Sequence, residues 1–271
     1  MKIVVIAAEG MLGTAWTRLT DVVAARFPEV DITRPATLPS FDGVDVVVNC
    51  AAWTDVDGAE ANEAAAAKVN GDAVLGLSRA CAKHGALLVH YSTDYVFSGD
   101  ATAPYPIDAP IDPVNAYGRT KALGEKALLE GGADHLLIRT SWVYAPWGKN
   151  FVLTMAALGR DRELLKVVND QRGRPTSAEH LAATSLRLIE KGARGTFHVT
   201  DGGECTWFDF ASHIVGRVNP SCRVEPCSSA EFPRPAPRPS YSVLDLSRTE
   251  ALLGPMPAWQ THVDRVLDAT D

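Results

Sequence analysis

Residues 3–13 read Ile3-Val4-Val5-Ile6-Ala7-Ala8-Glu9-Gly10-Met11-Leu12-Gly13. A short β-branched run leads into small residues and then into a predicted helix, which is the spacing of a glycine-rich dinucleotide loop with Ala7 in the first glycine position. Small residues in such a loop let the backbone approach a pyrophosphate, which binds the free N–H groups at the helix N-terminus. The alternative is a plain turn between a strand and a helix. The stretch therefore predicts a cofactor loop at Gly10, Met11 and Leu12.

The next part of the chain alternates apolar runs of strand length with alanine-rich stretches. Further strands are predicted at 22–25, 44–48, 87–89 and 136–138, and helices at 59–83 and 116–129. None of these apolar runs alternates with polar residues, as expected for strands buried on both faces of a parallel sheet. Strands and helices in alternation give an α/β fold with a doubly wound, parallel, Rossmann-type sheet.

The second half of the chain has a different character. Helices are predicted at 151–158, 178–191 and 207–218, and the proline-rich run 232–239 cannot form a regular helix or an internal strand. Apolar and helical sequence continues to Leu267, so this run is expected to be an ordered loop within a small C-terminal substrate-binding lobe. We expect residues 1–145 and 165–200 to form the dinucleotide-binding domain, and 146–164 and 201–271 to form the lobe.

Composition excludes several classes of protein. The chain of 271 residues has a formal net charge of −7 and a pI of about 5.5, and it lacks the basic stripe of a nucleic-acid-binding protein. Its five cysteines are odd in number and form no CxxC pair, which argues against a disulfide framework or a zinc site. No apolar stretch reaches the length of a membrane span. We expect a cytoplasmic protein.

Arg26 bears on the choice of cofactor. It follows the second predicted strand, about twenty residues after the start of the glycine-rich loop. An acidic residue there would bind the ribose 2′-hydroxyl of NAD, whereas an arginine suits the 2′-phosphate of NADP. Arg26 is therefore predicted to favour NADPH. NADH stays possible, because Arg26 could equally be a solvated surface charge.

Tyr117 and Lys121 are the predicted chemical centre. Four residues apart on a helix, their side chains lie on one face. Reduction of a ketone needs a hydride at carbon and a proton at oxygen, and a phenol can supply that proton. An adjacent ammonium group is predicted to lower the phenol's pKa from about 10 towards working pH. Thr93 lies in the segment directly after the strand predicted at 87–89. Ligands of open parallel sheets bind beyond the carboxyl ends of the strands, so its hydroxyl could polarise the same carbonyl.

These motifs resemble those of the dTDP-4-dehydrorhamnose reductase family, within the extended short-chain dehydrogenase/reductase superfamily. The resemblance rests on the glycine-rich loop, on Ser92-Thr93-Asp94-Tyr95-Val96-Phe97 and on Tyr117-Gly118-Arg119-Thr120-Lys121, and it runs nearly end to end. Further matching segments are 49–57, 139–144, 170–176 and 242–245. The resemblance implies NADPH-dependent reduction of the C4 keto group of a nucleotide-linked, by default dTDP-linked, 4-keto-6-deoxyhexose, as in rhamnose or related deoxysugar biosynthesis.

The resemblance also implies roles by position. Thr93, Tyr117 and Lys121 would be catalytic, and Lys121 would also hold the nicotinamide ribose. Residues implied at the sugar are Thr54, Val56, Asp94, Tyr95 and Trp142, and those implied at the cofactor are Gly10, Met11, Leu12, Ala51, Ala52 and Tyr117. From their chemistry we add Arg172, Arg174 and Arg238 as candidates for the substrate diphosphate, because a guanidinium group binds phosphate oxygens in pairs; each could instead be a surface arginine.

Some features depart from the family pattern. Ala7 adds a methyl group to a crowded turn, and the first helix is about one turn short. Some members bind magnesium through glutamates at a dimer interface, and one of those positions is Ala15 here, so no metal is expected. Either a monomer or a homodimer is compatible with the sequence.

Two other functions remain open. A sugar-nucleotide dehydratase or epimerase is the nearest enzyme, but dehydratases of the superfamily place a glutamate after the aspartate where Tyr95 follows Asp94. A non-catalytic, NADP-binding regulatory subunit is the other alternative. The intact set of Thr93, Tyr117 and Lys121 argues against it.

Overall fold

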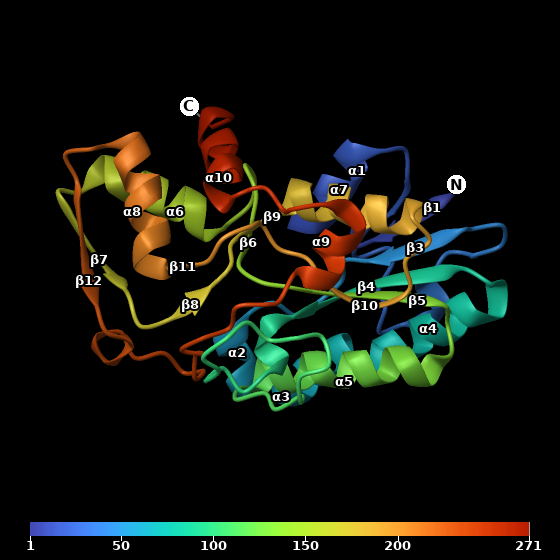
Figure 1. The fold of residues 1–271 in the computed structure, drawn as a ribbon. Helices are drawn as coiled ribbons and strands as arrows, with labels where there is room; N and C mark the ends of the chain where they lie inside the picture. The colour runs from blue at the N-terminus through green and yellow to red at the C-terminus, as the bar shows by residue number, and fades with distance from the viewer. Residues whose placement is uncertain (271) are drawn as a thin grey trace.

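The computed structural model describes residues 1–270 and contains a central six-stranded parallel sheet (Figure 1). In spatial order its strands are β10 (Gly195–His198), β5 (His135–Thr140), β4 (Leu87–Thr93), β3 (Val46–Asn49), β1 (Ile3–Ile6) and β2 (Val23–Ala25). The β-branched runs are in register, with Val46 opposite Ile3 and Leu87 opposite Val46. The expected doubly wound α/β sheet is confirmed.

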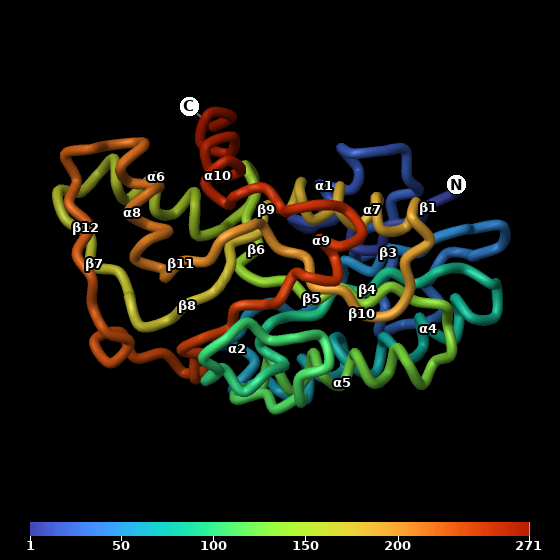
Figure 2. The backbone as a smooth tube through the Cα atoms, viewed as in Figure 1, coloured from blue at the N-terminus to red at the C-terminus, as the bar shows by residue number. Residues whose placement is uncertain are grey.

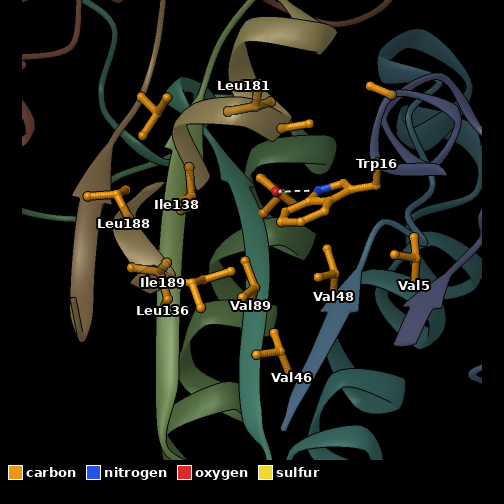
Figure 3. Packing of buried hydrophobic residues seen from close by; sticks show 14 of the residues in the cluster. Val5, Trp16, Val46, Val48, Val89, Leu136, Ile138, Leu181, Leu188 and Ile189 are labelled. Carbon is orange, nitrogen blue, oxygen red and sulfur yellow. Dashed lines mark hydrogen bonds between the residues drawn. The ribbon is translucent and has the colours of Figure 1, made fainter. Parts of the chain in front are cut away.

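Helices cover both faces of the sheet. On one face lie α1 (Met11–Leu19) and α7 (Ala178–Glu190); on the other lie α2 (Val56–Ala61), α3 (Glu63–Ala67), α4 (Ala73–His84) and α5 (Ala116–Gly131) (Figure 1). Trp16 of α1 is fully buried among the valines of β1, β3 and β4, and its indole N–H donates to the hydroxyl of Tyr91 at 2.9 Å (Figure 3). Alternate residues of each strand therefore enter one of two separate cores, as burial on both faces requires.

The strand order reverses between β1 and β3, because the chain proceeds outward from β1 to β2 and then returns to β3 on the other side. Crossovers on the two sides leave a crevice beyond the carboxyl ends of these strands, and this is where open α/β sheets bind ligands. The glycine-rich loop follows β1, and Ala51 follows β3 closely. The topology therefore brings the predicted cofactor residues to one place.

Most of the remaining elements lie beyond one end of the sheet. They are β6 (Val143–Tyr144), α6 (Phe151–Asp161), β7 (Leu164–Val168), β8 (Arg172–Gly173), β9 (Thr176–Ser177), β11 (Cys205–Thr206), α8 (Trp207–Val218), β12 (Arg223–Cys227) and α10 (Trp259–Asp268). The helix α9 (Ser247–Leu253) instead packs against β10, where Thr249 Oγ1 donates to the backbone carbonyl of His198. An apolar cluster centred on Phe210 joins α6, α8 and α10. After β12 the chain runs back beneath the lobe to α2 before it reaches α9 (Figure 2). This return segment holds the proline-rich run.

Several elements differ from the sequence prediction. The helix predicted at 59–83 is divided into α2, α3, a π-helical turn (Lys68–Asp72) and α4. In the π-helical turn, the side chain of Asn70 bonds the backbone of Trp53 and the hydroxyl of Thr120. The break between α2 and α3 falls at Asn62, whose side-chain amide donates to the carbonyl of Gly58. β2 is an edge strand with Val23 exposed, and not a doubly buried strand. β7 pairs with β12 instead of joining the large sheet, so residues 165–168, placed with the dinucleotide-binding part, lie in the lobe's sheet.

Across residues 1–270, no helix is both long and apolar enough to cross a membrane.

Candidate active site

The turn between β1 and α1 is shaped by very close backbone packing. A Cβ atom on Gly13 would lie 2.2 Å from the carbonyl oxygen of Ala7, so only glycine lets α1 approach the end of β1 this closely. Ala7 adopts the left-handed conformation, with φ of 56°, that glycine would adopt there. An L-residue in this region costs roughly 1–2 kcal/mol. The turn thus keeps its shape despite the methyl group.

The N-terminus of α1 is open towards a ligand. Its N-cap is Gly10, which has no side chain to accept from the first N–H groups, and the first turn carries no acidic residue. These unpaired donors and the positive end of the helix dipole favour a phosphate group. The loop fits a dinucleotide pyrophosphate on these grounds.

A cavity of about 1010 Å³ extends from this loop to the lobe. Its volume is at the upper end of the range for ligand sites, as a site for two ligands requires. The predicted residues that line it are Gly10, Met11, Leu12, Ala51, Ala52, Thr54, Val56, Thr93, Asp94, Tyr95, Tyr117, Lys121, Trp142 and Arg238. These residues come from both halves of the chain, and the fold brings them to one surface.

Three predicted arginines lie elsewhere. Arg26 directly follows β2 and is exposed, outside the cavity lining. Arg172 lies 3.4 Å from a carboxylate oxygen of Glu204. Arg174 is partly buried, and its backbone carbonyl accepts from Ser141 Oγ at 2.6 Å. Neither Arg172 nor Arg174 is among the residues that line the cavity.

Tyr117 and Lys121 are held rigidly at the start of α5. Asn115 caps the helix by accepting from the N–H of Gly118 at 2.8 Å. A Cβ on Gly118 would lie 2.1 Å from the carbonyl oxygen of Tyr95, so α5 packs directly on the loop that follows β4. Lys121 Nζ donates to the backbone carbonyl of Tyr91 at 2.6 Å. The helix and β4 therefore fix both side chains relative to Thr93.

The pKa values of this pair differ from the sequence prediction. Burial raises the pKa of Tyr117, the negative charge of Asp94 raises it further, and a hydrogen bond with Thr93 opposes both. Burial lowers the pKa of Lys121 to about 8. The prediction that Lys121 lowers the pKa of the phenol is wrong for this arrangement, because burial dominates and the ammonium group bonds Tyr91. Tyr117 keeps its proton at neutral pH, as a proton donor must.

Asp94 is the other ionisable group at this position. It is 3% exposed, and burial raises its pKa to about 6 although Ser242 and Thr93 lower it in part. Thr93 Oγ1 donates to Oδ1 of Asp94 at 2.9 Å and accepts from the N–H of Tyr95. Oδ2 has no hydrogen bond of standard geometry. Oδ2 of Asp94 therefore remains a free acceptor near the hydroxyl of Thr93.

Trp142 is a further residue that lines the cavity. Its backbone has φ of 47°, an unusual value for a tryptophan, just after β5. The indole stacks on Trp207 of α8, with ring centroids 3.6 Å apart and an angle of 11° between the planes. Non-glycine residues in this region cluster at ligand sites. Trp142 thus links the sheet to the lobe and presents a flat apolar surface at the cavity.

Comparison with known proteins supports this geometry. The family model for the RmlD substrate binding domain matches residues 1–271. A dTDP-4-dehydrorhamnose reductase of Burkholderia thailandensis is 42% identical over 97% of this chain and 97% of its own. The chain belongs to the dTDP-4-dehydrorhamnose reductase family.

Solved structures of the family share the whole architecture. The dTDP-4-dehydrorhamnose reductase of Clostridium acetobutylicum superposes with a TM-score of 0.94, at 37% identity and with 99% of each chain covered. That of Bacillus anthracis, solved in complex with NADP, also has a TM-score of 0.94, at 34% identity and with 99% of each chain covered. The present chain therefore shares the arrangement of sheet and lobe with these reductases.

On the lobe side, the cavity is lined by further residues that were not predicted from the sequence. They are Lys149, Lys166, Gln171, Trp207, Phe232 and Arg234. Their segments are distant in the sequence. Two signals were available: Gln171 lies in the matching segment 170–176, and Phe232 and Arg234 lie in the proline-rich run, where an ordered loop predicts contacts with another element.

A second polar cluster of this reductase-family chain lies outside the cavity. His180, Asp201 and His262 each bring a possible ligand atom within 4.8 Å of the others, the one such group within the described part of the chain. Asp201 lies 2.6 Å from His180 and accepts from Tyr144 at 2.9 Å. The two imidazole rings are stacked at an angle of 17°, so their lone pairs lie in nearly parallel planes and do not converge as ligands of a tetrahedral ion must. We describe it as a hydrogen-bond network between α7 and α10.

Proposed function

We propose that this protein uses NADPH to reduce the C4 keto group of a nucleotide-linked 4-keto-6-deoxyhexose, with dTDP as the nucleotide. The observation that carries the proposal is the meeting of Thr93, Tyr117 and Lys121 with the open N-terminus of α1 on one cavity wall. The reductases to which the chain is similar act on a sugar of this class by name. Rhamnose is the default product, and related deoxysugars are the alternatives.

NADPH would supply the hydride. We assign its pyrophosphate to the N–H groups around Gly10, Met11 and Leu12, and the adjacent cavity wall to Ala51 and Ala52. Arg26, exposed beyond β2, is close in sequence to the strand end that faces an adenosine ribose in such folds, and its guanidinium group suits a 2′-phosphate.

Tyr117 would donate a proton to the keto oxygen as the carbon accepts the hydride. Burial keeps the phenol protonated. The Thr93 hydroxyl, which donates to Asp94 in this structure, would turn its proton to the same keto oxygen when substrate binds. Lys121 would hold the nicotinamide ribose with the Nζ donors that Tyr91 does not use, since an ammonium group has three. Its depressed pKa of about 8 leaves it charged near neutral pH.

The lobe would hold the sugar nucleotide. We assign the sugar to Thr54, Val56, Asp94, Tyr95 and Trp142, and the diphosphate to Arg238. Arg174 does not line the cavity, and we assign it only a supporting role, because its backbone carbonyl accepts a hydrogen bond from the lining residue Ser141. We take the lobe to comprise residues 146–168 and 201–271, because β7 pairs with β12.

The alternatives are less consistent with the site. Elimination of water by a dehydratase needs a second acid–base group beside Asp94, and burial raises the pKa of the Tyr95 phenol, which makes it a poor base. A regulatory subunit has no need of a buried Tyr117, Thr93 and Lys121 at one cavity.

Every residue given a role belongs to a single chain, so a monomer and a homodimer are both compatible with the proposal. All five cysteines are free, which fits a cytoplasmic location.

The proposal is tested by following NADPH oxidation with a panel of dTDP- and UDP-linked 4-keto-6-deoxy sugars. We expect turnover with a dTDP-linked 4-keto sugar and none with the corresponding 4-hydroxy sugar. Tight NADPH binding with no turnover on any keto sugar would favour the regulatory subunit.

A further inference from the structure

Asp57 of α2 holds the proline-rich strap, residues 232–239, against the cavity. We propose that Asp57 is a positioning residue that fixes Arg234 and Arg238 as an anion site for the diphosphate of the nucleotide-linked substrate. The inference rests on the proposed function and adds to it a site, its ligand chemistry and the residue that builds it.

One carboxylate accounts for most of the polar contacts of the strap. Oδ2 of Asp57 accepts from Nε and Nη2 of Arg234 at 3.0 and 2.6 Å. Oδ1 accepts from Nη2 of Arg238 at 3.0 Å and from the backbone N–H of Ala236 at 3.3 Å. These contacts join residues about 180 positions apart in the chain. These contacts bind the strap to α2.

The strap cannot hold this shape by itself. Four prolines between 232 and 239 lack N–H donors, and the run forms no helix or strand. Besides Asp57, it is anchored by Asn115, whose side-chain amide donates to the carbonyl of Pro237 at 3.0 Å. Asn115 also caps α5, the helix of Tyr117. Asn115 therefore ties the strap to α5, which carries Tyr117 and Lys121, and Asp57 ties it to α2.

Arg238 is left with a donor that points at no protein group. Its side chain is 17% exposed, and its Nη1 is buried and has no hydrogen-bond partner. The guanidinium carbon lies 6.0 Å from the ring centroid of Tyr95, and Arg238 lines the cavity with Tyr95 and Val56. A buried unpaired N–H on a cation is costly unless a ligand uses it. A phosphate oxygen is the acceptor that fits a guanidinium group best.

Charge in this part of the wall also favours an anion. Two guanidinium groups share one carboxylate, which leaves a net positive charge. Lys149 and Lys166 line the same cavity, which also contains the carboxyl groups of Glu9 and Asp94, so basic side chains remain in excess. Burial raises the pKa of Asp57, but the Ala236 N–H and the two arginines lower it by more, so this carboxylate is ionised. Both of its oxygens are already engaged by the strap. Asp57 therefore serves to orient the arginines while they retain donors for the ligand.

Asp57 could in principle have the opposite effect and weaken binding of the diphosphate, so the two effects predict changes of opposite sign. A carboxylate near a diphosphate repels it, so removal of its charge would strengthen binding if repulsion outweighed orientation. Orientation predicts the reverse, since hydrogen bonds to charged groups are worth enough to change affinity roughly 10- to 100-fold. The sign of the change in dTDP affinity thus decides between the two.

The experiment measures the dissociation constants of dTDP, thymidine and NADPH for the full-length protein by titration calorimetry. The variants are Asp57→Asn, Arg238→Ala and the double variant, with Glu63→Gln as control. Glu63 of α3 forms a bidentate pair with Arg119 of α5, and both side chains are 43% exposed and lie outside the cavity lining. The control thus removes a similar acid–arginine contact that has no link to the strap.

We expect Asp57→Asn to lower the affinity for dTDP roughly 10- to 100-fold. The affinities for thymidine and NADPH should be the same as in Glu63→Gln, and KM for the sugar nucleotide should rise by more than kcat falls. In the Arg238→Ala background, the Asp57→Asn change should lower the affinity for dTDP much less. Unchanged or tighter dTDP binding by Asp57→Asn overturns the inference, as does a parallel loss of thymidine and NADPH affinity, which indicates general loosening. If the wild type binds no dTDP and reduces no keto sugar, the proposed function fails as well.

Discussion

Replacing Asp94 by asparagine should remove a loss of stability that the wild-type protein undergoes as the pH rises from about 4 to 7. Asp94 is 3% exposed, and its pKa in the folded protein is about 6 against an ordinary 3.8. This difference corresponds to about 3 kcal/mol in the free energy of unfolding once the carboxyl ionises. The folded protein binds more protons than the unfolded chain between about pH 4 and 6, so stability falls as the pH rises through that window.

The measurement is urea unfolding of the wild type and Asp94→Asn at a series of pH values. The asparagine does not titrate, so the difference in unfolding free energy between variant and wild type should rise by about 3 kcal/mol from about pH 4 to pH 7. Hydrogen bonds lost equally at every pH cancel in this comparison. Asp21→Asn, at an exposed position, is the control and should show no such change. A difference that is independent of pH, or that falls as pH rises, refutes the reasoning.

Three further predictions concern the ligands. Arg26→Asp should reverse or abolish a preference for NADPH over NADH in binding titrations, and a wild type that binds NADH more tightly contradicts the role of Arg26. Trp142→Ala should raise KM for the keto sugar but leave NADPH affinity nearly intact in a folded protein, because the indole faces the lobe; an unchanged KM would mean that its stack with Trp207 is only structural. Lys121→Met should lower both turnover and NADPH affinity, and a loss of only one would separate the two jobs assigned to it.

The sheet and the cofactor loop were predictable because local chemistry decides them. Val46, Val47 and Val48 are fully buried on both faces of the sheet, and a continuous β-branched run has few other stable environments. Gly13 follows from the same logic, since only glycine permits the close packing behind the loop. Tyr117 and Lys121 share a helix face whatever the rest of the fold does. These features depend on neighbours within a few residues.

Features that depend on distant contacts were not predictable. The alanine-rich stretch at 59–83 is compatible with one helix, and the bonds of Asn70 in its π-helical turn join it to Trp53 and Thr120, which lie outside the stretch. Arg174 and Arg238 look equivalent as arginines, yet only Arg238 lines the cavity, because its strap is held by Asp57. The raised pKa of Tyr117 comes from burial and from Asp94, neither of which the spacing of Tyr117 and Lys121 reveals.

The central claim is that Tyr117 donates the proton in the reduction of a nucleotide-linked keto sugar. Tyr117→Phe keeps the ring in place and deletes the one acidic proton. Single-turnover NADPH oxidation by this variant, with a dTDP-linked 4-keto-6-deoxy sugar at saturation, tests the claim most directly. We expect the rate to fall roughly 10²- to 10⁴-fold, the usual contribution of general acid catalysis, while NADPH binds as it does to the wild type. A folded Tyr117→Phe variant that reduces the sugar at nearly the wild-type rate would contradict the account.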